Sequence, residues 1–348
     1  MSILSRQKEF SSKKGTVLIN AFWILFILLL VVSAFAWRIS LELKISKLFT
    51  LRLKTLYAAR SAISWANEIK KNLDMNPHCD YLDENWAGKR ENDIFKDQAI
   101  GETEVSIKYL DHYDETGAPV YYYGLIDEER KINLNIDDLN VLRMFLGNLM
   151  RIINTTGTVI LTSDIIEAII DWRDTNQLTR NNEEENNYYG YLNRNGKFKV
   201  LEELLLLKGM DKEKFAFLQK YLTVYGTGKI NINTSDREIL TTMVSVFSSI
   251  SQIAPYLDRL VNEIIEFRPF SSVADLFNLP VIQEVLSSLP EEIRGALISS
   301  LQGVIDNWIT FTSSAFQTNI EVEAGNVKKT VRAVFNHPEG RIIYWNEN

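Results

Sequence analysis

The run TVLINAFWILFILLLVVSAFAW occupies residues Thr16 to Trp37 and contains no charged side chain. At about 1.5 Å of rise per residue, a helix of this run spans about 33 Å, enough to cross a hydrocarbon core of about 30 Å. A single crossing segment must be helical, because only a helix satisfies all of its own backbone N–H and C=O groups within lipid. No later stretch is as long and as apolar. We therefore expect one membrane helix, with the bulk of the chain on one side of it.

The segment before this run is a basic leader, in which four basic side chains accompany a single acidic residue, Glu9. This excess favours a cytoplasmic N-terminus, although basic residues after Trp37 weaken the asymmetry. A secretory signal carries its small-residue cleavage site after the apolar region, whereas Gly15 precedes it here. Cleavage between Gly15 and Thr16 would therefore leave the apolar helix on the mature chain. An uncleaved signal anchor is the alternative.

Apolar residues recur at helical spacing from Leu41 to Leu73, and the pair Asn76-Pro77 follows as a stop signal. We predict one helix from Thr16 to about Leu73, lipid-soluble in its first half and amphipathic in its second half. A signal anchor followed by a separate helix is the alternative. The amphipathic half must lay its apolar stripe on a folded domain.

Strand-like segments lie on both sides of a long helical block. Glu102 to Leu110 and Val120 to Ile126 are expected to form a hairpin across the turn-rich connection DETGAP. Three further strands are expected near the C-terminus, at Ala315 to Glu323, Val327 to Phe335 and Arg341 to Trp345. The block between them, about residues 136 to 309, has almost entirely helical patterns.

The helical block contains an internal repeat. KINLN at 131–135 recurs as KININ at 229–233, AIIDWR at 168–173 as EIIEFR at 263–268, and LEELLLLKGM at 201–210 as VADLFNLPVI at 273–282. The first copy carries extra residues between Arg173 and Val200. Each copy resembles a helix-hairpin-helix unit, a fold that grips phosphates at a helix N-terminus. The second glycine of that turn is missing from both copies, and Asp211 would face a phosphate.

The extra residues of the first copy form an acidic loop. The loop and the helix end before it bring many hard oxygen donors into a short span, among them Asp171, Asp174, Asn176, Glu183, Glu184, Glu185 and Asn187. Close carboxylates repel one another, which raises their pKa values, and a bound divalent cation would remove this repulsion. Calcium accepts many oxygen ligands in flexible geometry, whereas the absence of thiol and imidazole ligands from the loop argues against zinc. A solvated acidic loop without metal is the alternative.

Composition narrows the class of protein. The hydrophobic fraction of 46% is ample for folded cores, and the net charge of −7 disfavours binding to nucleic acid. The single Cys79 excludes an internal disulfide framework. The three histidines are scattered, and no catalytic motif is present. We therefore do not expect an enzyme.

These features together resemble the K-type minor pseudopilin of type II secretion systems. The leader ending in Lys-Lys-Gly, the loop DWRD to EEENNYY, and the segment VYGTGKININT at 224–234 carry the resemblance, which covers nearly the whole chain. Most pilin-like proteins have Glu at mature position five, where this chain has Asn20. The K-type family also tends to lack a Glu at this position, so Asn20 agrees with the resemblance.

The resemblance implies an α+β fold: a pilin-like long N-terminal helix on an antiparallel sheet, with a large all-α domain inserted between strands. The expected division is a prepilin-type leader, 1–15; a transmembrane segment, 16–37; the pilin-like helix and first strands, 38–135; an inserted helical domain with duplicated helix-hairpin-helix-like units, 136–309; and the C-terminal strands, 310–348.

The resemblance also implies a function. Such a subunit sits at the tip of the periplasmic pseudopilus with the I-type and J-type minor pseudopilins, above the major pseudopilin, after processing by prepilin peptidase in the bacterial inner membrane. In the family, calcium sites lie in the inserted domain. By position, Asp174, Asn176, Glu185 and Asn187 align with the family's acidic loop. Asp171 and Glu184 are neighbouring candidate ligands. Asn20 is the expected determinant of the tip position. A membrane-anchored DNA-binding protein of a competence-type system is the alternative.

Overall fold

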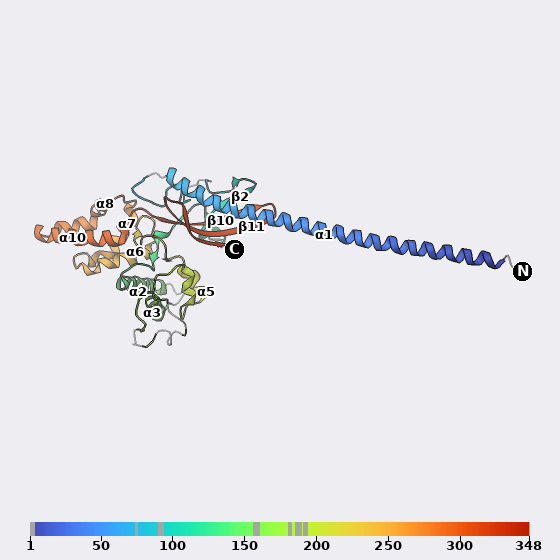
Figure 1. Cartoon of the computed structure of the whole chain (residues 1–348). Helices are drawn as coiled ribbons and strands as arrows, with labels where there is room; N and C mark the ends of the chain where they lie inside the picture. The colour runs from blue at the N-terminus through green and yellow to red at the C-terminus, as the bar shows by residue number, and fades with distance from the viewer. Residues whose placement is uncertain are drawn as a thin grey trace.

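The structure is a computed structural model that describes residues 4–73, 76–89, 94–155, 161–179, 183–184, 190 and 194–347, with side chains from Gly15 onward. Its longest element is the helix α1, Leu4–Asn72, which projects from the folded body toward the N-terminus (Figure 1). The predicted helix is therefore confirmed, and it ends within one residue of the predicted position. It also begins earlier than predicted, because part of the leader continues the same helix.

The two halves of α1 differ in what covers them. Every residue from Gly15 to Thr50 is exposed. Near the C-terminal end, Ala59, Ala62, Ile63 and Ala66 are fully buried and form one face of the helix. Because alanine is small, this face brings the helix backbone close to the sheet, where it packs on strands β2, β10 and β11.

The sheet under α1 is antiparallel, with the strand order β1-β2-β10-β11-β12 and β5 beside β10. The bounds are β1 Gln98–Ile100, β2 Thr103–Ile107, β5 Ile126–Asp127, β10 Ala315–Ala324, β11 Val327–Asn336 and β12 Arg341–Glu347. Val322 pairs with Val105 and Ile320 with Ile107, and all four side chains are buried in the core shared with α1. The three predicted C-terminal strands are confirmed.

The predicted hairpin of residues 102–110 with 120–126 is only partly correct. The first segment is two strands, because β2 pairs with β1 and β10, whereas β3, Tyr109–Tyr113, pairs with β4, Pro119–Tyr122. The apolar residues of β2 pair with β10, which is a longer and more buried strand than β4, the partner that the predicted hairpin would give them. The turn itself forms as expected, with the Asp114 carboxylate accepting hydrogen bonds from the backbone of Thr116 and Ala118.

The short 3₁₀ helix η1, Glu128–Arg130, precedes β6, Ile132–Asn133, and the remaining helices that the structure describes lie between β6 and β9, Ile309–Thr310. They are α2 Leu139–Thr155, α3 Ser163–Arg173, η2 Leu201–Leu206, α5 Lys212–Leu218, α6 Arg237–Val244, η3 Ser245–Ser249, η4 Ala254–Tyr256, α7 Leu257–Phe267, α8 Val273–Phe277, α9 Pro280–Ser288 and α10 Glu291–Trp308. We call residues 128–313 the insertion. Its buried apolar residues form a cluster of their own, separate from the α1–sheet core. The residue-level domain boundaries given above stay a prediction.

The sequence repeat appears in the structure as a repeated pairing. The strand β6 pairs in parallel with β7, Leu222–Thr223, and β8, Ile230–Asn231, pairs in parallel with β9. In the first copy the Asn135 amide exchanges two hydrogen bonds with the backbone of Phe198, and in the second copy Asn233 does the same with Phe270. The repeated asparagines therefore fasten equivalent points of the two copies.

Candidate functional site

The first candidate site is the exposed part of α1. Among the residues that the structure describes, this helix alone is long and apolar enough to cross a membrane, over the stretch Gly15–Asn72. Gly15, Thr16 and Asn20 all lie on its exposed N-terminal part, and among the described residues nothing packs within 4 Å of the position where a Gly15 Cβ would lie. The predicted processing bond and the Asn20 amide are therefore placed on an uncovered helix.

The second candidate site is the acidic loop that follows α3. Asp171 is buried in the last turn of α3, and Asp174 caps its C-terminus with an N–H donated to the carbonyl of Ile170. Asn176 donates its side-chain N–H to the Asp174 carboxylate at 2.6 Å. Burial, and next the negative charge of Asp171, raise the pKa of Asp174. The structure thus brings Asp171, Asp174 and Asn176 together, in an environment that disfavours the charged carboxylate.

Of the other predicted ligands, Glu184, Glu185 and Asn187, the structure describes only Glu184. Glu184 forms an antiparallel bridge with Leu178, while Glu185 and Asn187 lie outside the described residues. Within the described part of the chain, no group of three or more acidic, histidine or cysteine side chains has the closeness of a metal site. The oxygen-bearing side chains and the raised pKa of Asp174 still fit a hard cation such as calcium, because the cation would favour the ionised carboxylates.

The acidic loop leaves and re-enters the insertion at one place. Gly196 N donates to Trp172 O at 3.0 Å, Asn195 Nδ2 donates to Asn176 O at 2.7 Å, and the rings of Trp172 and Phe198 stack at 5.7 Å. Arg268 and Phe270 of the second copy correspond to Arg173 and Phe198 of the first, and only Pro269 separates them. The loop is therefore an addition to a unit that closes without it.

The helix-hairpin-helix turns do not offer free phosphate sites. In the first copy the Asp211 carboxylate caps the N-terminus of α5 and accepts from Lys214 N at 2.8 Å. In the second copy the Glu263 carboxylate accepts from Val281 N, at the start of α9, at 2.8 Å. A carboxylate therefore occupies the place that a phosphate would take at both helix N-termini, which argues against the DNA-binding alternative.

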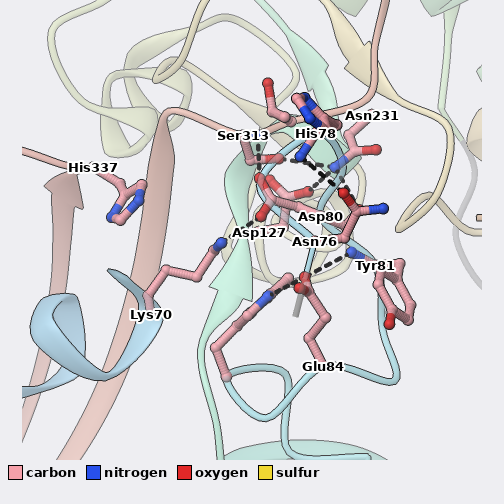
Figure 2. Close-up of polar contacts among 12 residues, drawn as sticks. Lys70, Asn76, His78, Asp80, Tyr81, Glu84, Asp127, Asn231, Ser313 and His337 are labelled. Carbon is pink, nitrogen blue, oxygen red and sulfur yellow. Dashed lines mark hydrogen bonds and ion pairs between the residues drawn. The ribbon is translucent and has the colours of Figure 1, made fainter. Parts of the chain in front are cut away.

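A third site, which the sequence analysis did not identify, lies where the insertion joins the sheet. Lys70 near the end of α1 forms an ion pair of 2.5 Å with Asp80, and the two side chains are 1% and 5% exposed. The second Asp80 oxygen accepts from Ser313 N at 2.5 Å. Figure 2 shows these groups converging with Asp127 and Asn231. We call Lys70, Asp80, Asp127, Glu129, Asn231, Thr234 and Ser313 the hinge cluster.

Asp127 lies at the centre of the hinge cluster. Its carboxylate accepts from Glu129 N at 2.7 Å, Asn231 Nδ2 at 3.1 Å and Thr234 Oγ1 at 2.6 Å. Burial, and next the charge of Glu129, raise the pKa of Asp127 to about 7, against the opposing effect of the hydroxyl contacts. The signal in the sequence is the acidic run Asp127 to Glu129, directly before the first repeat strand.

Comparisons with known proteins agree with the resemblance found in the sequence. A family model described as "Type II secretion system (T2SS), protein K" matches residues 138–227. No curated protein sequence matches this chain. A chain in the crystal structure of the GspK-GspI-GspJ complex from the enterotoxigenic Escherichia coli type 2 secretion system is similar, with a TM-score of 0.57 and 14% sequence identity over 85% of this chain and 96% of that chain. The structural match confirms the predicted α+β fold.

Proposed function

We propose that this chain is a minor pseudopilin of a type II secretion system. In this role α1 crosses the bacterial inner membrane, with its N-terminus in the cytoplasm and its bulk in the periplasm. The observation that carries the proposal is a combination: a helix long and apolar enough to cross a membrane continues as the spine of an antiparallel sheet, and residues 138–227 of the insertion match the protein K family model.

The tip of the pseudopilus is the position that the molecule's shape favours. The insertion lies at the end of the molecule opposite the N-terminus of α1 (Figure 1). A subunit stacked above this chain would meet that bulk, so we propose that growth proceeds only below it. The partners in the tip complex are then the I-type and J-type minor pseudopilins, with the major pseudopilin beneath them.

Co-purification from detergent-solubilised membranes tests this assembly. Chain expressed with the I-type and J-type subunits of its own system should retain both on an affinity tag placed at the C-terminus. The intact mass of the purified chain should lack residues 1–15 when prepilin peptidase is active. Retention of neither partner by a chain with a native circular dichroism spectrum would contradict the tip-complex role, and an uncut chain would return it to a signal anchor.

The Asn20 amide is proposed as the determinant of the tip position. A carboxylate in lipid is costly unless it is paired, and a subunit at the top of a filament has no neighbour above to pair with. Asn20→Glu should therefore reduce secretion, whereas Asn20→Gln, which is also neutral, should leave it unchanged. Normal secretion by the Glu variant at the same protein level would exclude this role for Asn20.

We further propose that the acidic loop binds calcium through Asp171, Asp174 and Asn176, with Glu184, Glu185 and Asn187 as the remaining predicted ligands. Extracellular calcium modules bind at about 10⁻⁴ to 10⁻³ M, and we expect the same range here. Calorimetric titration of the full chain with calcium should give one or more sites in this range. Asp174→Asn should weaken binding at least about tenfold, about 1.4 kcal/mol.

The second repeat supplies a matched loop-free variant. Replacing residues 174–197 by a single proline, as Pro269 joins Arg268 to Phe270, should abolish calcium binding without unfolding the insertion. Glu213→Gln, an exposed carboxyl group on α5, is the control that should leave binding unchanged. Calcium binding that survives loop replacement would place the site elsewhere.

A further inference from the structure

A cavity of about 320 Å³ lies where the insertion, the strand β3 and the sheet strands β11 and β12 meet. The charged side chains that line it are the cations Arg130, Lys131, Lys220 and Arg332 and the acids Asp111, Glu128 and Asp236. Glu202, which is not among them, pairs with Arg332 at 2.6 Å, so the charges of this region balance. What distinguishes the cavity is the use of its hydrogen-bonding groups.

One wall of the cavity holds a buried ammonium group with unused donors. The Lys131 side chain is only 8% exposed, and its Nζ group donates to Glu128 Oε1 at 2.7 Å. The other Glu128 oxygen accepts from Thr223 Oγ1. An ammonium group has three N–H donors, and this contact is the one side-chain hydrogen bond that Lys131 makes to the described residues. Two of its donors therefore lack an acceptor.

The other acidic groups of the cavity are already engaged. Asp236 Oδ1 accepts from Arg130 Nη2 at 2.5 Å, and Asp111 Oδ2 lies 2.7 Å from Nδ1 of the His112 ring. Lys220 Nζ lies 3.8 Å from Asp236 Oδ2, which is beyond hydrogen-bond distance. The cavity therefore offers more donors than acceptors.

The strand β3 meets the cavity along an open edge. Tyr109, Leu110 and Asp111 are consecutive, and all three line the cavity. Successive side chains of a strand point to opposite faces, so three neighbours can line one cavity only where the strand meets it edge-on. Among the described residues β3 pairs with β4 alone, and no residue of β4 lines the cavity. The unpaired edge of β3 therefore faces the cavity.

We propose that this cavity binds an extended acidic peptide segment of a partner protein, which pairs with the edge of β3 and places one carboxylate against Lys131. An ionised carboxylate has only acceptors, whereas an amide side chain would bring two further donors into a cavity that already has too many. Main-chain pairing with an open strand edge supplies affinity, and a pocket for one side chain supplies specificity. The proposal does not rest on the secretion role.

Fluorescence anisotropy on the full chain in detergent micelles tests the site. The probe is the labelled and capped peptide Ser-Thr-Glu-Thr-Ser, compared with the same peptide carrying Gln in place of Glu. The Glu peptide should bind with a Kd below about 1 mM, and the Gln peptide at least about tenfold more weakly. Methylation of alternate backbone amides of the Glu peptide should also weaken binding at least about tenfold, because it removes the donors that pair with β3.

Variants of the chain locate the peptide. Lys131→Met combined with Glu128→Gln, which leaves no buried charge unpaired, should abolish binding. Lys220→Gln should weaken binding at least about threefold and, as an exposed residue, should not affect folding. Lys328→Gln is the matched control and should leave binding unchanged, because Lys220 and Lys328 are 58% and 57% exposed and Lys328 pairs with acids outside the cavity.

Several results would overturn the proposal. They are a Kd of the Glu peptide above about 1 mM, equal binding of the Glu and Gln peptides, and full binding by the Lys220→Gln chain or by a double variant with a native circular dichroism spectrum. Equal binding of the methylated peptide would remove the role of β3. Displacement of the peptide by free propionate at the peptide's own Kd would mean a site for small acids in place of a peptide site.

These outcomes are distinguishable from a failure of the proposed function. The secretion role is tested by co-purification and by the mass of the processed chain, and neither measurement involves the cavity.

Discussion

At the residue scale, the Lys70–Asp80 ion pair is the polar contact whose loss should cost the most stability. Both groups are buried, and Lys70 Nζ also lies 5.8 Å and 5.9 Å from the ring centroids of Trp86 and Phe316. Lys70→Met should lower the free energy of unfolding by about 3–5 kcal/mol, because it leaves a buried carboxylate without its cation. Urea unfolding followed by tryptophan fluorescence measures this change.

The matched control is Lys54→Met, which removes a second lysine–carboxylate pair on the same helix. Lys54 Nζ lies 2.5 Å from Glu102, but the Glu102 side chain is 79% exposed. Surface pairs contribute about 0–1 kcal/mol, so this variant should remain close to wild type. Equal losses in the two variants would show that burial of the Lys70 pair has no special energetic role.

Lys70 also illustrates a limit of sequence reasoning. Its position in an amphipathic helix gives no sign of burial, which arises only because Asp80, Trp86 and Phe316 meet it from elsewhere in the chain. Asp127 escaped the sequence analysis for the same reason. The acidic loop, by contrast, was recognised because Asp171, Asp174 and Asn176 are neighbours in the sequence itself.

At the element scale, the alanine face of α1 should tolerate no larger side chain. Ala62 is fully buried against the sheet, and its neighbour Ser64 on the same helix is exposed. Ala62→Leu should cost about 1–3 kcal/mol because the helix must move away from β10 or β11. Ser64→Leu should change stability by less than about 0.5 kcal/mol. Thermal unfolding of both variants in one detergent compares them, and an unchanged Ala62→Leu transition would mean that the helix–sheet contact is loose.

Elements were predictable where their signals are local. The end of α1 and the three C-terminal strands follow from periodicity and from turns whose glycines, Gly325 and Gly340, adopt positive φ angles. The segment at 102–110 was misread because its partner β10 lies more than two hundred residues away. The two-residue strands β6 to β9 carry no periodicity at all, although the repeat that contains β6 and β8 was visible as KINLN and KININ.

At the scale of the whole molecule, the two larger hydrophobic clusters indicate two folding units, and a small third cluster, in which Val200 and Tyr225 of the insertion pack against Ala315, Val334 and Tyr344, joins them. The insertion holds its own buried residues from Ile132 to Ile309, while α1 and the sheet share the other cluster. Its two ends meet, because the Glu129 carboxylate accepts from Ser314 N at 2.9 Å and β8 pairs with β9 near the exit. An insertion whose ends meet and whose main core is its own depends little on α1 and the sheet for its folding.

We therefore expect residues 128–313, expressed alone, to fold into a helical domain with a cooperative thermal transition in circular dichroism. The matched control is residues 128–304, which lacks Ile305 and Ile309 of the core and leaves β8 without β9. Removing these groups opens a cavity and frees backbone donors, so the shorter fragment should lose cooperativity. A longer fragment that melts without a transition would mean that the hinge contacts to the sheet complete the core, and that the insertion and the sheet fold as one unit.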